Sequence, residues 1–252
     1  MLLRRVIEHV KAQNWTAVAL DFVIVVLGVF MGLQAQQWFE ARNFDAAERT
    51  YLAELRAEIT ANAAMTDSRH EIMNIVVRSG NSAVDFLQAD EPCTAQCRDL
   101  LVDFFHASQV LFAPQTRTVY EEMQRLGLPR SDAVAAAAAA YYQYDSGLSS
   151  SIDTNPAFRV RVRGHIPPAA QRALWRDCHS VENAVEVLDA DCKPDINPET
   201  ARTIIENIRA DKALLNELIY WVGMNQHWSS LFSDLNAYGA QAVAAIDIAL
   251  GE

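Results

Sequence analysis

The sequence contains little glycine and proline, with nine glycines and eight prolines among 252 residues. Together they make up about half their usual share, which disfavours a turn-rich sandwich or barrel. Basic residues are also few: 21 lysines and arginines stand against 32 aspartates and glutamates, for a formal net charge of −11. Nucleic acid binding requires a cationic face, so we expect no nucleic acid partner.

Motifs for catalysis are missing as well. The six histidines, at positions 9, 70, 106, 165, 179 and 227, include no pair three or four apart, the spacing that places two metal ligands on one helix face. No glycine-rich phosphate loop, nucleophile elbow or Ser-xx-Lys motif occurs. Glu121 and Glu122 beside Tyr120 are typical of the first turn of a helix. We therefore expect a protein that is not an enzyme, with no catalytic residue, cofactor or resident metal.

The sequence does contain a long apolar segment near its start. Ala17 to Leu33 carries one charge, Asp21, and is flanked by Trp15 and Trp38. The stretch 15–38 has 24 residues, and a helix of that length extends about 36 Å, enough to cross a bilayer. Tryptophan at both ends matches the aromatic belts of membrane proteins. The sequence thus predicts a transmembrane helix over 15–38, with a buried core helix and a cleaved signal peptide as the alternatives.

The charges before this segment predict its orientation. Arg4, Arg5 and Lys11 precede it, and positive residues favour the cytoplasmic side. We expect residues 1–14 to form a basic cytoplasmic segment and residues 39–252 a periplasmic helical domain. The protein would be anchored in a bacterial inner membrane and would contact membrane lipid.

Three residues in the segment are candidates for contacts within the membrane. Gly28 and Gly32 are four apart, so they share a helix face that a second helix can approach closely. Asp21 is costly in hydrocarbon and needs either the cytoplasmic interface or a partner. This face predicts a homo-oligomer or a complex with another membrane protein. The alternative is that both glycines face lipid or the chain's own domain.

This segment and a later one resemble a known family. Residues 21–38 read Asp-Phe-Val-Ile-Val-Val-Leu-Gly-Val-Phe-Met-Gly-Leu-Gln-Ala-Gln-Gln-Trp, and residues 118–123 read Thr-Val-Tyr-Glu-Glu-Met before Gly127. Together with Tyr141-Tyr142, they resemble a family of uncharacterised bacterial single-span membrane proteins. The departures are an extra Val119 and glutamines where asparagines are more usual. The resemblance implies one membrane span and a helical extracytoplasmic part, and it implies no activity.

The rest of the chain predicts helices, because apolar residues recur every three or four positions. Trp221, Trp228 and Phe232 have this spacing and are expected in the core. Ser131 or Asp132 is expected to cap one helix. The expected helices are 41–87, 100–110, 114–126, 132–144, 168–189, 198–228 and 231–250. The expected fold is all-α, with one N-terminal transmembrane helix followed by an extracytoplasmic helical bundle with long helices.

One run, Phe158 to Arg163, alternates like a strand and holds the only local basic cluster beyond the N-terminus. In an extended segment, Arg159, Arg161 and Arg163 would share one face. Such a face could contact an anionic ligand, a lipid headgroup or an acidic partner. The alternative is that these arginines balance carboxylates of their own domain.

Four cysteines complete the set of candidates. Cys93 and Cys97 are four apart, and Cys178 and Cys192 bracket thirteen residues. Pairing of neighbours would give two disulfides, which agrees with an oxidising compartment such as the periplasm. A metal site with His179 or His106 and free thiols are the alternatives.

These observations favour a membrane-anchored interaction or accessory protein. It would assemble through the transmembrane helix and the helical bundle. The alternative is an extracytoplasmic sensor or ligand-binding domain. Since the segment before the span is short, such a sensor would need a separate signalling partner.

Overall fold

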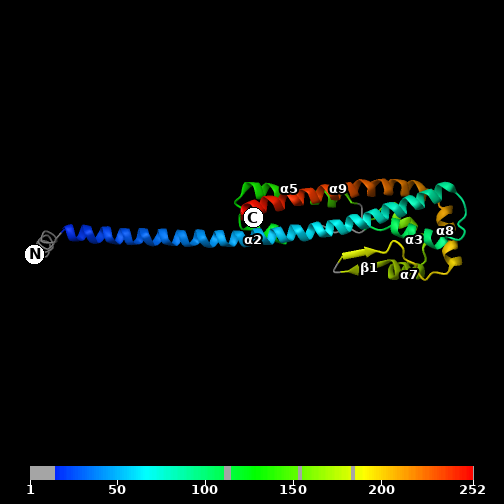
Figure 1. Cartoon of the computed structure of the whole chain (residues 1–252), viewed down its shortest axis with the longest axis horizontal. Helices are drawn as coiled ribbons and strands as arrows, with labels where there is room; N and C mark the ends of the chain where they lie inside the picture. The colour runs from blue at the N-terminus through cyan, green and yellow to red at the C-terminus, as the bar shows by residue number, and fades with distance from the viewer. Residues whose placement is uncertain (1–14, 111–114, 153–154, 183–184, 252) are drawn as a thin grey trace, which may run out of the picture. The chain divides into compact units, whose positions relative to one another are not determined.

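A computed structural model describes residues 15–110, 115–152, 155–182 and 185–251, and it shows eight helices and one pair of strands there (Figure 1). The all-α prediction is therefore confirmed. The chain divides into two units, Met1–Tyr51 and Leu52–Glu252. Helix α2, Trp15–Ala89, begins in the first unit and ends in the second. The segment predicted for 1–14 lies outside the described residues.

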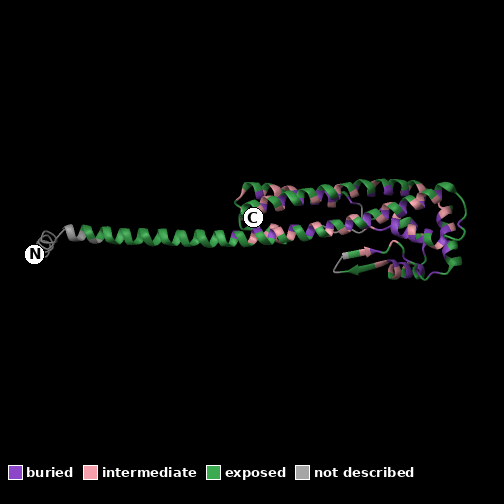
Figure 2. Cartoon of the chain, in the orientation of Figure 1, coloured by how far each residue is buried: buried purple, intermediate pink, exposed green. Residues whose placement is uncertain are grey.

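The described part of the first unit is the beginning of α2. Its residues from Phe22 to Leu33 are all exposed (Figure 2). By length and composition, this helix can cross a membrane. A core helix would bury such side chains, so that alternative is not supported. A signal sequence has the same composition, and that alternative stays open.

The second unit is built around α5, Asp132–Ser151, and α9, Ala213–Leu250, which lie side by side (Figure 1). The later part of α2 packs against both. A Cβ at Gly239 of α9 would lie 3.3 Å from the Tyr141 ring of α5 and 3.6 Å from Ile59 of α2. The missing side chain at Gly239 therefore lets three helices approach one another. The expected core residues Trp221, Trp228 and Phe232 are buried.

Shorter elements complete this unit. Helix α3 contacts α6, α7 and α8, and the Trp221 Nε1–H of α9 donates to the Ala107 carbonyl at the end of α3, at 2.7 Å. The two strands are antiparallel, with His179 opposite Leu188. The bounds are α3 Cys97–Ala107, α4 Thr118–Arg125, α6 Ala157–His165, α7 Pro168–Cys178, β1 His179–Glu182, β2 Val185–Leu188 and α8 Pro198–Ala210.

The strand predicted at Phe158 to Arg163 is wrong, because these residues lie in helix α6. Phe158 and Val162 are both buried, and their separation of four residues puts them on one helix face. The spacing of the two large apolar residues therefore decides the structure of this segment. The alternation of the arginines does not.

Several predicted helix boundaries are also wrong. The helix expected over 132–144 continues to Ser151. The helix expected over 168–189 ends at Cys178, and the chain continues as the hairpin of β1 and β2, which leaves Val181 exposed. The helix expected to begin at Asn197-Pro198 does begin there, and the Asn197 side chain accepts from the Glu199 N–H at 2.8 Å. It ends at Ala210. Helix α9 begins at Ala213 and runs to Leu250, without the break expected between residues 228 and 231. Ser131 caps α5 as predicted, accepting from the Val134 N–H.

Candidate functional site

The Gly28 and Gly32 face of α2 is open in the described structure. A Cβ added at either position would meet no atom within 4 Å. The face can therefore receive a second helix backbone, as the spacing predicts. The side chain of Asp21 lies outside the described residues. Contacts of these three residues within a membrane stay a prediction.

The three candidate arginines do not share a face, because α6 is a helix. Arg159 and Arg163 are four apart, and both reach the end of helix α3. The Arg159 Nη1–H donates to the Ser108 carbonyl at 2.9 Å, and the Arg163 Nε–H donates to the Ser108 Oγ at 2.6 Å. Cations at the C-terminal end of a helix satisfy carbonyls that have no partner within the helix.

Arg163 is also enclosed by aromatic rings. Its guanidinium lies 4.1 Å from the centroid of Phe105 and 5.2 Å from that of Trp175. Burial, with a smaller contribution from the charge of Arg159, lowers the pKa of Arg163 to about 9. The group is still charged at neutral pH and is stabilised by the ring faces and the end of α3.

Arg161 points elsewhere. It is exposed, and its guanidinium forms ion pairs with Glu217 at 3.0 Å and Asp211 at 3.6 Å. Charge balance within the domain thus accounts for this residue. An external anion or partner contact for the three arginines stays a prediction, now without the shared face that motivated it.

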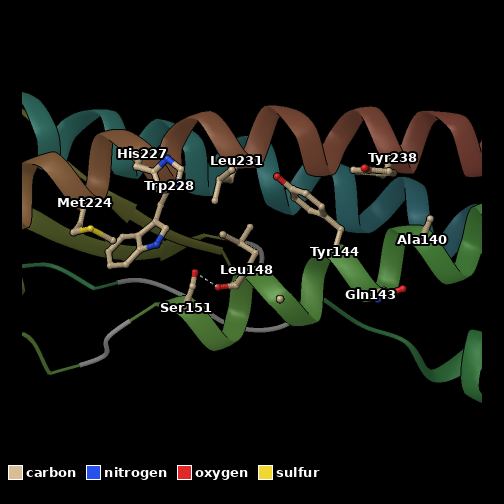
Figure 3. A pocket seen from close by; sticks show the side chains of 11 residues that line it. Ala140, Gln143, Tyr144, Leu148, Ser151, Met224, His227, Trp228, Leu231 and Tyr238 are labelled. Carbon is tan, nitrogen blue, oxygen red and sulfur yellow. Dashed lines mark hydrogen bonds between the residues drawn. The ribbon is translucent and has the colours of Figure 1, made fainter.

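A groove of about 600 Å³ lies between α5 and α9 (Figure 3). Trp228 extends from α9 towards Leu148, and Tyr144 points from α5 towards α9. The groove is lined mainly by apolar and aromatic residues, and its described lining includes no aspartate, glutamate, lysine or arginine. The lining residues are Ala140, Gln143, Tyr144, Gly147, Leu148, Ser151, Met224, His227, Trp228, Leu231 and Tyr238.

The size and lining of this groove suit a small apolar or aromatic molecule. The rings of Tyr144 and Tyr238 lie 4.9 Å apart, and the Tyr144 hydroxyl donates to Asp234 Oδ2 at 3.2 Å. Burial and then Asp234 raise the pKa of Tyr144, which therefore stays neutral. None of the three candidate arginines lines the groove.

A polar cluster that is not among the predictions surrounds Glu58 of α2. Its carboxylate accepts from the Val119 N–H at 2.9 Å, the Tyr120 N–H at 3.3 Å and the Tyr142 hydroxyl at 2.7 Å. The first two donors belong to the first turn of α4, whose N-terminus favours an acid. Tyr120 stacks on Tyr142 with centroids 4.4 Å apart. Burial and the hydrogen bond to Glu58 raise the pKa of Tyr142.

The same face of α2 continues this cluster one and two turns later. Asn62 exchanges two hydrogen bonds with the backbone of Thr116, at 2.7 and 3.1 Å. Gln115 Nε2–H donates to the Thr66 hydroxyl at 2.6 Å. Glu58, Asn62 and Thr66 are four residues apart, so they hold residues 115–120 along one side of the helix. A cavity of about 480 Å³ lies beside these groups.

An ion pair with a buried carboxylate lies next to the cluster. The Arg117 guanidinium contacts the carboxylate of Asp145, which has no exposed surface, at 2.9 Å, and donates to the Ser146 hydroxyl at 3.1 Å. Burial lowers the pKa of Arg69, and the negative charge of Asp145 partly offsets this lowering. The carboxylates of Glu58 and Asp145 are thus both committed to internal contacts. The cluster is suited to holding α2, α4 and α5 together.

Sequence reasoning missed this cluster, although one signal was present. Polar residues at 58, 62 and 66 lie on one face of a predicted helix, and such a polar line indicates contacts with another buried polar segment. The sequence did not identify that segment, because Thr116 and Tyr120 are more than fifty positions from their partners in α2.

The cysteines form two disulfides, Cys93–Cys97 and Cys178–Cys192, and the described chain has no free cysteine. The predicted pairing is thus present in the structure. Beside the second disulfide lies His106, which is fully buried. Burial lowers the pKa of His106 to about 4. The imidazole is therefore neutral at physiological pH.

The comparisons with known proteins do not add a function. The chain matches no protein family, no curated protein and no solved structure. The resemblance to the single-span membrane family therefore stays a prediction.

Proposed function

We propose that this chain is a non-enzymatic, membrane-anchored interaction or accessory protein. The observation that supports this most directly is the apolar beginning of α2. Its described side chains from Phe22 to Leu33 are exposed. Gly28 and Gly32 leave a shallow gap between these side chains, because a Cβ added at either position would meet no atom within 4 Å. Lipid can cover the apolar side chains, and the backbone of a second helix can pack against the two glycines.

The rest of the chain supports a location for this proposal. The positive residues before the span favour a cytoplasmic N-terminus. Two disulfides in the second unit favour an oxidising compartment, and in a bacterium this is the periplasm. The helical second unit would then lie on the periplasmic side of the inner membrane and offer its surface to partners.

The double substitution Gly28→Ile and Gly32→Ile tests the proposal. Two branched side chains would hold the helices apart, so assembly should weaken at least about tenfold, or about 1.4 kcal/mol. Native mass spectrometry of the protein extracted in mild detergent measures both the copy number and any second protein. A homo-oligomer and a complex with another membrane protein both fit the proposal.

The matched control is Val26→Ile with Phe30→Ile. At about 100° per residue, positions 26 and 30 lie on the face opposite the two glycines, and both substitutions keep the helix apolar. The control should assemble like the wild type. Unchanged assembly of the glycine variant, or equal loss in both variants, would contradict the proposal.

The groove between α5 and α9 favours a second function, binding of a small apolar or aromatic ligand by an extracytoplasmic sensor domain. The supporting observation is its volume of about 600 Å³ with Trp228, Tyr144 and Tyr238 in its lining. Ligand sites of this size and composition are common in proteins. A sensor of this kind would pass its signal to a separate membrane partner.

The substitution Gly147→Leu tests ligand binding. Gly147 lines the groove, and a Cβ added there would meet no atom within 4 Å, so we expect a leucine side chain to take up space in the groove. Fluorine NMR with a fluorinated indole as the probe should show binding to the wild type and at least about tenfold weaker binding to the variant. Gly164→Leu is the control, because Gly164 also lies in a helix with open space but outside the groove. Equal binding by the wild type and Gly147→Leu would dismiss this function.

A further inference from the structure

A buried histidine and two cysteines meet in the second unit. One donor atom each from His106, Cys178 and Cys192 lies within 4.8 Å of the other two. All three residues are buried, and His106 has no exposed surface. Among the described residues, this is the only group of histidine, cysteine or acidic side chains so close together.

The three residues come from different elements. His106 lies in the last turn of α3, Cys178 ends α7, and Cys192 follows strand β2. The backbone holds the two cysteines near each other independently of their sulfur atoms. The strands pair between them, and the Asp189 N–H donates to the Cys178 carbonyl at 3.1 Å. The Cα atoms of the cysteines are 5.1 Å apart.

We propose that Cys178 and Cys192, once their disulfide is reduced, form with His106 a binding site for a divalent cation of the zinc class. In the oxidised protein the sulfur atoms are bonded to each other and bind no cation. The site is therefore controlled by the redox state of one disulfide.

The chemistry balances with a dithiol as the reductant. The dithiol transfers two electrons and two protons to the disulfide and itself becomes a disulfide, leaving two thiols on the protein. Cation binding then releases the two thiol protons to solvent, and two thiolates and one imidazole become ligands.

The donor set and its dimensions suit zinc. Zinc prefers thiolate and imidazole in a tetrahedron, and with bond lengths of about 2.3 and 2.0 Å its ligand atoms lie roughly 3.5–3.8 Å apart. The three donor atoms already lie within 4.8 Å of one another, and after reduction the two sulfur atoms must move apart to the spacing of zinc ligands. Three protein ligands leave a fourth position for water. The buried surroundings disfavour free thiolates, so a cation would also compensate their charge.

The other disulfide provides a comparison within the chain. Cys93 and Cys97 are also buried, but no third donor of this kind joins them among the described residues. Reduction there should produce two thiols without a three-ligand site.

Cobalt(II) is a suitable probe, because thiolate coordination gives it a charge-transfer absorption. The full-length protein is reduced with dithiothreitol, freed of reductant under nitrogen, and titrated with cobalt(II). We expect one cobalt per reduced chain and none in the oxidised chain. The variant Cys93→Ser with Cys97→Ser should bind like the wild type. Absence of binding by the reduced wild type would overturn the proposal.

Two histidine variants test the third ligand. His106→Ala should weaken cobalt binding at least about tenfold, since even residues that only support a ligand contribute 10–100-fold. His179→Ala is the control, because His179 is adjacent to Cys178 but outside the group. Equal affinity in the wild type and His106→Ala would overturn the proposal. X-ray absorption of the cobalt-loaded wild type needs no variant: two sulfur ligands and a histidine nitrogen are expected, and a shell without that nitrogen would overturn it.

Discussion

Replacing Arg117 with alanine is expected to lower the free energy of unfolding by about 2 kcal/mol, because the buried carboxylate of Asp145 loses the charged hydrogen bond of Arg117 and keeps only the nearby charge of Arg69. Asp145 has no exposed surface, and Arg117 contacts it at 2.9 Å. Arg117 also donates to Ser146 and lies over the Tyr142 ring, 5.7 Å from its centroid. Urea denaturation of the full-length protein, followed by near-UV circular dichroism, measures the change.

The double variant Arg117→Met with Asp145→Leu is the control for this prediction. Removing both charges also removes the cost of burying the carboxylate, while Arg69 loses the charge of Asp145, so part of the lost stability should return. If the loss of stability in the double variant is smaller than the sum of the losses in the two single variants, the difference measures the interaction of the ion pair. Wild-type stability in Arg117→Ala, or a double variant less stable than either single variant, would contradict the prediction.

Three of the residues that motivated the resemblance to the single-span family, Tyr120, Tyr141 and Tyr142, lie in this region of the fold. Tyr120 stacks on Tyr142, Tyr142 donates to Glu58, and Tyr141 packs where α5 meets Gly239. Glu58 in turn caps α4. Packing and capping thus account for these aromatic positions, and they require no reaction at the tyrosines.

Local chemistry made much of the fold predictable. The apolar beginning of α2, the Ser131 cap of α5 and the Asn197-Pro198 start of α8 are all signals carried by neighbouring residues. The disulfide partners were predictable because each pair is close in sequence. Such features require no knowledge of where distant segments meet.

The errors arose where local signals compete or where distant contacts decide. At α6, alternating arginines imitate a strand, whereas burial of Phe158 and Val162 selects a helix. After Cys178, the bond to Cys192 and the backbone contacts of the hairpin outweigh the helical spacing of Val181 and Leu188. His106 was an alternative ligand in the sequence, but only the fold places it beside these cysteines.

Replacing Arg163 with alanine is also expected to cost about 2 kcal/mol of unfolding free energy, because the contacts of the guanidinium outweigh the cost of burying its charge. The guanidinium is enclosed by Phe105 and Trp175 and donates to Ser108 and the Phe105 carbonyl, at 2.6 and 3.4 Å. Charged hydrogen bonds contribute about 1.5–3 kcal/mol, and a desolvated cation over rings adds up to roughly 2. The variant loses these contacts and leaves the end of α3 with fewer donors.

Arg161→Ala is the matched control, two residues away on the same helix. Its ion pairs with Glu217 and Asp211 are exposed, so its removal should leave the unfolding free energy nearly unchanged. Denaturation of both variants under the same conditions separates a structural arginine from a surface one. If Arg163→Ala proved as stable as Arg161→Ala, the contacts with α3 would not explain the residue. Arg163 would then have to be explained by a partner or anion contact, as the sequence first suggested.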